Sequence, residues 1–442
     1  MASQQPAQPR LKRQLGVFEM TATGVGIILG AGIYVLIGEA AGLAGNGVWV
    51  PFILSAVAAA FTGLTYAELA ARFPRAGATF EYTRRAFGPR TGFVAGWTML
   101  FAASIQVSAV GIGFAGYLSS LVDLPRIPVT LSLIAVSSVI IWLGVRESVR
   151  LGITFALVEL FGLLLAIGVS IQFVGAVDYL EFAGGFSEVM QGSALLFFAF
   201  LGFEQMANLA EEARNPSKNL PRSIVLAVVI ITVVYMLVAV TSVSAVPWED
   251  LAESSAPLGL VVETATGAEL SSVLSVIALF ATANTVLFGI LAASRQAFGM
   301  ARAGAIPTRL AALSAARGTP TLAIIFVAVL SGIFSLAGDI GAVAQMSNAA
   351  VLIAFMLVNA SLIWIAKTQP TDNDSRVASR YAINGISIVP ILGLVTSAVM
   401  LGYTGTIPIL LGCTLVATGV VVRLLMERTN QTAGETPVDF ER

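Results

Sequence analysis

The sequence contains no histidine and a single cysteine, Cys413, among its 442 residues. Without these residue types the chain cannot build an internal disulfide, a His/Cys zinc site, an iron–sulfur cluster or a histidine-based catalytic triad. Charged residues are also scarce: they make up 11% of the chain, against about 25% in a typical soluble domain. The formal net charge of −1 gives no basic excess that would indicate nucleic acid as a partner. Any function must therefore use carboxylates, hydroxyls, amides, backbone groups or the lipid bilayer.

Apolar residues are 57% of the chain, or about 252 residues. A membrane-spanning helix needs roughly 20 mainly apolar residues, so this content predicts about twelve spans in an all-α membrane protein. The strands of a membrane barrel are shorter and alternate in polarity, which these runs do not. The expected helices lie at 17–41, 47–71, 91–121, 127–145, 150–175, 188–210, 222–247, 270–303, 319–338, 340–366, 382–404 and 406–426.

Positive charge predicts the orientation of these helices. With the N-terminus inside, 23 of the 24 Lys and Arg residues fall in cytoplasmic segments, and only Arg126 falls outside. Such a bias is what the positive-inside rule expects of a multi-pass protein, here placed in the cell membrane. Tails at 1–14 and 427–442 are then cytoplasmic, and the second is expected to be disordered.

Helix 1 carries four glycines within nine residues, at 24, 26, 30 and 32. Each weakens a helix by roughly 1 kcal/mol relative to alanine. One interpretation is a discontinuous helix that lines a cavity, whose second half starts near Gly30 and presents N–H groups to an anion. The other is close helix packing, because Gly26 and Gly30 form a GxxxG spacing.

Helix 6 has a glycine and a carboxylate at mid-depth, Gly202 and Glu204. Paired interruptions in corresponding helices of two halves indicate a transporter site. A five-helix repeat at 15–176 starts inside and a second at 186–366 starts outside, so the repeat would be inverted. Helices 11 and 12, at 382–426, follow it.

Four ordered segments then carry a family resemblance: GIILGAGIY at 26–34, YAELAARFPRAG at 66–77, FLGFE at 200–204 with EEARNPSKNLP at 211–221, and SRQAFGMAR at 294–302. Together they resemble the amino acid–polyamine–organocation permeases, near the cationic-amino-acid-transporter-like branch. The resemblance implies a LeuT-type fold, with two inverted five-helix repeats, broken helices 1 and 6, and two further helices.

The resemblance also implies where an amino acid would bind. Its carboxylate would meet N–H groups of Gly30, Ala31 and Gly32, and its ammonium the carbonyls of Ile28, Phe198 and Leu201. Opposed half-helix ends suit such a zwitterion. Phe200, Phe203 and Gly289 are candidates for recognising the side chain, although ordinary helix packing would equally explain the two aromatic residues.

Three carboxylates lie within the predicted spans, where an ionised acid costs roughly 2.5–3.5 kcal/mol on insertion scales. Glu39, near the outer end of helix 1, is either at an outer gate or an interfacial residue. Glu204 belongs to the Gly-Phe-Glu motif, for which the resemblance implies coupling around the gate. It could also make a hydrogen bond that holds the broken helix together.

Glu159 in helix 5 departs from the family pattern, since proton-coupled relatives carry a lysine at the aligned position. Burial favours the neutral form of a carboxyl group, so Glu159 could load and release a proton. It could instead bind Na⁺ together with Asn284 and Thr285, or make only a structural hydrogen bond. No other cofactor is expected.

The sequence thus predicts a secondary active amino acid transporter, with proton-coupled import by alternating access. An amino acid or amine exchanger and a non-transporting sensor on the same fold are the alternatives. An enzyme is not expected, because no nucleophile–base pair with His or Cys and no HExxH run exist. Cationic and neutral substrates both stay open, as does the oligomeric state.

Overall fold

The computed structural model describes residues 15–73, 78–143, 145–211, 213–302, 304–314, 317–368, 382–383 and 386–432. The elements of the first half are α1 (Val17–Ile28), α2 (Gly32–Ala44), η1 (Gly45–Gly47), α3 (Trp49–Arg72), α4 (Ala78–Phe87), α5 (Pro89–Ser119), α6 (Arg126–Leu143), α7 (Val145–Ser170) and η2 (Ile171–Phe173). Those of the second half are α8 (Phe186–Leu196), η3 (Phe197–Phe200), η4 (Phe203–Glu211), α9 (Pro216–Ala245), α10 (Trp248–Glu253), α11 (Pro257–Thr266), α12 (Ala268–Arg302), η5 (Thr308–Ala311), α13 (Thr321–Ser335), α14 (Ile340–Thr368), β1 (Ala382–Ile383), β2 (Ile386–Ser387), α15 (Ile388–Tyr403) and α16 (Thr406–Thr432).

The helical membrane architecture predicted from composition is confirmed. Among the described residues, eight helices are long and apolar enough to cross a membrane, and the bent pair α1–α2 makes a ninth. Three shorter apolar helices, at 186–200, 321–335 and 388–403, lie where spans 6, 9 and 11 were expected. The count of twelve spans and the LeuT-type inverted repeat stay predictions.

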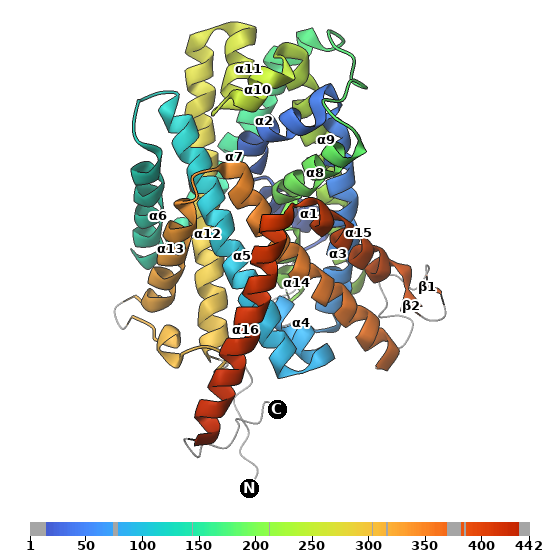
Figure 1. Cartoon of the computed structure of the whole chain (residues 1–442), viewed down its shortest axis with the longest axis vertical. Coiled ribbons are helices and arrows are strands. Elements are labelled where there is room, and N and C mark those ends of the chain that lie inside the picture. The colour runs from blue at the N-terminus through green and yellow to red at the C-terminus, as the bar shows by residue number, and fades with distance from the viewer. Residues whose placement is uncertain are drawn as a thin grey trace.

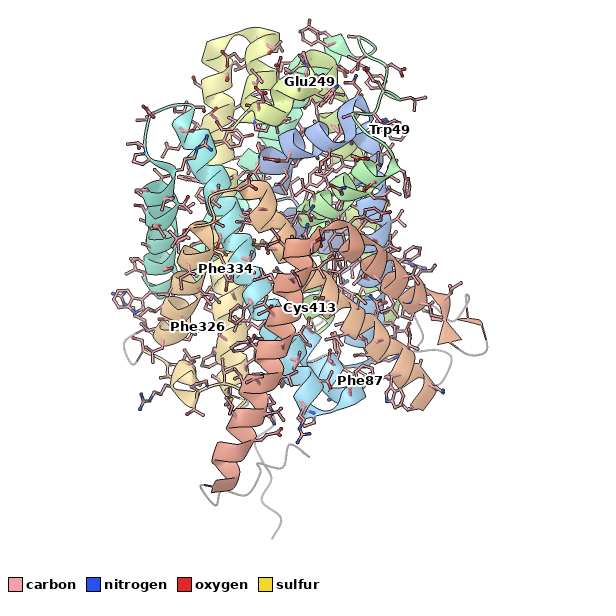
Figure 2. All side chains as sticks on the ribbon, viewed as in Figure 1. Trp49, Phe87, Glu249, Phe326, Phe334 and Cys413 are labelled. Atoms are coloured by element: carbon pink, nitrogen blue, oxygen red, sulfur yellow. The ribbon has the colours of Figure 1, made fainter. Side chains whose placement is uncertain are left out.

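Long helices form the centre of the bundle, where α5 packs against both α12 and α14 (Figure 1). The helices α6 and α13 lie side by side at one edge, and α3 packs on α9. Helix α16 covers α5 and α14 and carries the exposed Cys413, while Glu249 lies at the opposite end of the molecule from the C-terminal end of α16 (Figure 2).

Several helix ends differ from the sequence prediction by a few residues, among them the starts of α7 and α9, and local contacts accompany two of these differences. Span 11 begins at Ile388 instead of 382, because the preceding residues form the short antiparallel pair β1–β2 and Ser387 caps the helix by accepting from the Val389 N–H at 3.3 Å. Helix α16 continues past 426 to Thr432. Glu427, in this extension, forms an ion pair with Arg90 of α5 at 2.9 Å. The predicted tails at 1–14 and beyond 432, and most of the linker expected at 367–381, lie outside the described residues.

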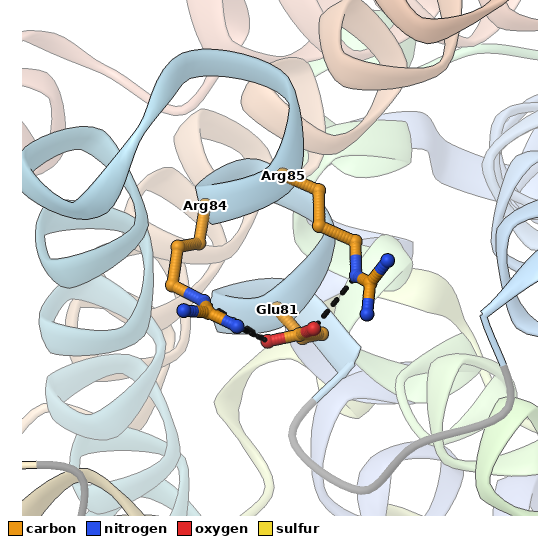
Figure 3. A network of polar contacts seen from close by, with 3 residues as sticks. All are labelled: Glu81, Arg84 and Arg85. Atoms are coloured by element: carbon orange, nitrogen blue, oxygen red, sulfur yellow. Dashed lines mark hydrogen bonds and ion pairs between the residues drawn. The ribbon is translucent and has the colours of Figure 1, made fainter. Parts of the chain in front are cut away.

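Helix α4 was not predicted, because ten residues with several charges do not look like a span. Its Glu81 accepts hydrogen bonds from Arg84 at 2.9 Å and from Arg85 at 2.7 Å (Figure 3). The hydroxyl of Thr79 lies 2.7 Å from that of the buried Tyr66 on α3. These contacts fix α4 as a short polar helix beneath α5 and α14. Helices α10 and α11 lie between two spans and were also not predicted, because their 6 and 10 residues are too few to cross a membrane.

Candidate functional site

Helix 1 is broken where its glycines predicted an interruption. Helix α1 ends at Ile28 and α2 begins at Gly32, and the two axes differ by 58°. The break itself is only three residues long. Because the first N–H groups of a helix have no partner within it, the start of α2 presents donors and a positive dipole end at this depth.

Helix 6 is broken in a different manner. After α8 the chain continues as the 3₁₀ turns η3, passes Leu201 and Gly202, and resumes as η4. Gly202 has φ +119°, a conformation that side chains rarely adopt. A Cβ at this glycine would also lie 2.9 Å from the Ile27 carbonyl oxygen. Both facts require glycine at 202, and the second places this break directly against helix 1.

The two breaks are also joined at a second point. A Cβ on Gly32 would lie 2.7 Å from the Ala199 Cα, so the backbones of α2 and η3 touch. The Tyr235 hydroxyl of α9 lies 3.4 Å from the Ile28 carbonyl oxygen and 3.3 Å from that of Ala199. One buried hydroxyl therefore bridges the last turn before each break.

Several groups predicted to bind substrate already have protein partners. The Ala31 N–H donates to Thr285 Oγ1 at 3.1 Å, and the Ile28 carbonyl lies near Tyr235. The Phe198 carbonyl accepts from the Leu201 N–H at 3.2 Å. The structure thus brings the predicted groups of both breaks together, and an incoming ligand would have to share or displace these internal bonds.

The candidate side-chain positions face different neighbours. Phe200 is fully buried and meets the Tyr235 ring at 5.6 Å. Phe203 packs edge to face with Tyr66 and lies 5.4 Å from Phe355, so it belongs to an aromatic cluster between α3, η4 and α14. Gly289 faces α5, because a Cβ there would lie 2.6 Å from the Val107 side chain.

Glu159 is completely buried on α7. Neither oxygen of its side chain has a hydrogen-bond partner among the described residues, and the same holds for Asn284 Oδ1. The nearest defined contact is to its main chain, whose carbonyl accepts from the Tyr34 hydroxyl at 2.6 Å. A charged carboxylate without a partner would be costly here, whereas a neutral carboxyl group or a carboxylate beside a cation would not. Asn284 and Thr285 make no hydrogen bond to it.

The other two predicted acids are placed apart from Glu159. Glu204 accepts from the Gly202 N–H at 2.8 Å, so its carboxylate caps the start of η4 within the second break. Glu39 is half-buried in the C-terminal half of α2. A Cβ built on Gly341 would lie 3.3 Å from its Oε2 and 3.7 Å from Asp339 Oδ1, so these two acids share one neighbour on α14.

Residues 15–414 match the profile of the family described as "Amino acid permease". The chain belongs to this family. It is therefore a membrane permease and not an enzyme, and the resemblance found in the four sequence segments is confirmed.

Three relatives illustrate the breadth of this permease's similarity. It is 27% identical to "Branched-chain amino acid permease BcaP" of Bacillus subtilis (strain 168), covering 95% of this chain and 94% of the relative. The protein of the same name from Lactococcus lactis subsp. cremoris (strain MG1363) is 30% identical over 86% and 87%. "Cationic amino acid transporter 4, vacuolar" of Arabidopsis thaliana is 28% identical over 82% of the permease and 64% of the relative.

Two polar residues at the breaks of the permease were missed in the sequence. One is Tyr235, whose bridging role depends on a fold that no local pattern reveals. The other is Asn348 on α14, whose amide donates to the Ala194 carbonyl at 2.7 Å and to that of Leu195 at 3.1 Å. Its Oδ1 is buried without a partner among the described residues. An asparagine within an apolar span was a usable signal, since polar groups at that depth need a reason.

Proposed function

We propose that this permease is a secondary active transporter that moves amino acids by alternating access. The observation that carries the proposal is the meeting of two interrupted helices at Gly32 with Ala199 and at Gly202 with Ile27. Paired breaks of this kind form midplane binding sites in transporters. Each break also divides its helix into two half-helices. When these half-helices tilt, the binding groups at the break can face one side of the membrane and then the other.

The breaks favour a zwitterionic substrate. The N-terminal end of α2 attracts a carboxylate, and the carbonyl groups at the end of the helix before each break attract an ammonium group. These dipoles bind both charges of an amino acid without a buried ionised side chain. The observed bonds of the Ala31 N–H and the Ile28 carbonyl show that both groups are directed at partners inside the protein.

We further propose a neutral substrate with an apolar side chain. The wall at the second break is aromatic, with Phe200 fully buried beside Tyr235. Glu204 is the acid closest to this wall in the chain, and its carboxylate is occupied by the Gly202 N–H. Two relatives named as branched-chain amino acid permeases agree with this choice. A cationic substrate would need an acidic partner that this wall does not offer.

Glu159 is the proposed proton carrier. Its fully buried side chain has no partner among the described residues, which suits a neutral, protonated carboxyl group. Tyr34 ties the main chain at this position to the outer half of helix 1. A movement of that half-helix that admits water would let Glu159 lose its proton. Import would then be driven by protons that enter with the amino acid.

The test is uptake of radiolabelled leucine, valine, alanine and arginine into proteoliposomes whose lumen contains no substrate. We expect leucine and valine to accumulate only when the outside is more acidic than the lumen, and uptake to fall as the outside pH rises. Accumulation driven only by sodium would place a metal ion at Glu159. Flux seen only after preloading would make the protein an exchanger, and saturable binding without flux would make it a sensor.

A matched pair of variants tests the carrier itself. Glu159→Gln keeps the size and polarity of the side chain but cannot ionise. It should abolish accumulation driven by the pH gradient while preserving exchange of leucine against preloaded leucine. Glu263→Gln, on the exposed outer face of α11, should behave as wild type. Unchanged pH dependence of uptake in Glu159→Gln would refute the proton-carrier assignment.

A further inference from the structure

An apolar groove of about 370 Å³ runs between α6 and α13, at the edge of the bundle. Its walls include Leu131, Ile134 and Ala135 on α6, and Val329, Gly332 and Ile333 on α13. Val329 and Ile333 are 57% and 58% exposed, so the groove opens outward and not into the bundle. In a membrane-spanning protein the medium at such a face is lipid, whose chains match the apolar walls.

The groove exists because α13 is held on its other side. The ring of its Phe334, labelled in Figure 2, has its centre 6.5 Å from that of Phe101 on α5, and Ser108 Oγ donates to the Ser331 carbonyl at 2.6 Å. On the open side stands Gly332, where a Cβ would lie 3.3 Å from the Leu131 side chain. The missing side chain at 332 leaves the hollow between the two helices.

A cation lies where the same two helices approach the predicted cytoplasmic surface. The Arg317 guanidinium lies 3.8 Å from the centre of the Trp142 ring, at the last turn of α6. Thr319, just before α13, donates to the Trp142 carbonyl at 3.3 Å and so fixes the two chain segments together. Arg317 is exposed, and no ion pair joins it to a carboxylate of the described residues.

The distance from this cation to the groove suits a lipid. Ala135 and Trp142 are seven residues apart, so they share one face of α6. Trp142 and Ile134 are separated by eight residues, as are Thr321 and Val329, which is about 12 Å along each helix. Half of the hydrocarbon core of a bilayer is about 15 Å. A chain that starts at the level of Arg317 therefore reaches the near end of the groove, at Ile134 and Val329, whereas Leu131 and Gly332 lie about 16 Å away, close to the bilayer midplane.

We propose that the α6–α13 seam binds an anionic phospholipid of the cytoplasmic leaflet, with its phosphate at Arg317 and one acyl chain in the groove. Arginine is the residue best suited to phosphate, which its planar guanidinium binds through two parallel hydrogen bonds. The cytoplasmic leaflet is the one that carries anionic lipid in excess. Tryptophan is enriched at membrane interfaces, and Trp142 belongs to the last turn of α6, the predicted cytoplasmic end of this span. This site is independent of the substrate and of its coupling ion.

The experiment is native mass spectrometry of the full-length protein in detergent, titrated with phosphatidylglycerol or phosphatidylcholine. Arg317→Gln should weaken binding of phosphatidylglycerol about fivefold and leave phosphatidylcholine unchanged, since one basic residue at a membrane surface contributes about 1 kcal/mol. Arg309→Gln is the matched control, an exposed arginine of the same connection between α12 and α13. It should bind both lipids as wild type does.

The groove is tested separately by filling it. Gly332→Leu should weaken binding of both lipids, and Val329→Trp fills the groove from an exposed position if the first variant does not fold. Equal losses in Arg317→Gln and Arg309→Gln would overturn the proposal in favour of general attraction to basic loops. Unchanged binding in the filled variants would overturn the groove as the chain site. A dimer that becomes a monomer by light scattering in Val329→Trp would assign the groove to a second copy of the chain.

Discussion

The two broken helices of this permease are interrupted in opposite ways. The break in helix 1 is short, with three residues between two α-helices. The break in helix 6 is long, because 3₁₀ turns extend on both sides of Leu201 and Gly202. Aromatic rings line the second break, and Phe197, Phe200 and Phe203 are all fully buried. The three residues of the first break, 29–31, carry no aromatic ring, and Tyr235 of α9 is shared by both breaks.

Gly32 at the first break and Gly202 at the second are required for different reasons. At Gly32 a glycine is required because two backbones touch, and at Gly202 because the chain also turns into a left-handed conformation. The first break leaves the ends of α1 and α2 at the proposed binding site. The second break packs against both ends, through Gly202 at Ile27 and Ala199 at Gly32. Substitutions at the two breaks should therefore lower uptake and stability to different degrees.

The largest effect is expected for Gly202→Ala, which combines an unfavourable φ of +119° with a Cβ 2.9 Å from the Ile27 carbonyl oxygen. We expect uptake to fall below one tenth of wild type and the melting temperature in detergent to drop, because backbone strain of this kind costs about 1–3 kcal/mol. Gly304→Ala is the control, with φ +67° and no atom within 4 Å of its Cβ. Equal losses in both variants would show that the contact with helix 1 is unimportant.

Gly32→Ala should have the next largest effect. Its conformation suits alanine, but the added Cβ would press on the Ala199 Cα at 2.7 Å and separate the two breaks. We expect several-fold slower uptake from a protein that still folds, as judged by size-exclusion chromatography. Gly26→Ala, with nothing within 4 Å of its Cβ, should transport normally and be slightly more stable. Normal transport by Gly32→Ala would exclude close contact as the reason for glycine here.

Tyr235→Phe should have a smaller effect. It removes the hydroxyl that bridges the Ile28 and Ala199 carbonyls but keeps the buried ring. Leaving buried acceptors unpaired costs about 1–3 kcal/mol, so both the melting temperature and the uptake rate should fall. Tyr117→Phe loses one buried hydroxyl bond, to the Tyr34 carbonyl, outside the breaks. It should lose stability but less transport, and an equal loss of transport would argue against a special bridge.

Thr285→Val is expected to have the smallest effect. The variant keeps the shape of the side chain and removes the acceptor of the Ala31 N–H. Loss of one neutral hydrogen bond costs about 1 kcal/mol, so we expect a change of only a few-fold in the KM for leucine uptake. Thr282→Val, one turn earlier, loses only bonds to carbonyls of its own helix and should leave the KM unaltered. If both variants had the same KM for leucine uptake, the Thr285 hydroxyl would have no role in substrate binding.

The short, glycine-rich break in helix 1 was easier to predict from the sequence than the long 3₁₀ break in helix 6. Four glycines within nine residues weaken a helix locally, so the interruption of helix 1 was visible in the sequence. Its second half starts at Gly32, two residues later than expected, next to Ala31, whose N–H donates to Thr285 of a distant helix. Tertiary contacts of that kind leave no trace in local composition.

The second break shows the limit more strongly. Gly202 and Glu204 indicated its position, and Glu204 does cap the following turns. The length of the 3₁₀ segments depends on how aromatic side chains pack between helices, which no periodicity reports. The carboxyl oxygens of Glu159 and the Oδ1 of Asn284 are buried without a hydrogen-bond partner among the described residues, and their joint binding of Na⁺ stays a prediction. Short polar elements such as α4 were missed because span length was the main signal.

The single cysteine has a practical consequence. Cys413 is exposed on α16, a helix that packs on α5 and α14. Because the chain has no other thiol, one substitution creates a protein with two labelling positions and no native cysteine has to be removed. Phe18 on α1 is 81% exposed and would accept the second probe as Phe18→Cys. Spin labels at these two positions would report the distance between α1 and α16, with and without added amino acid.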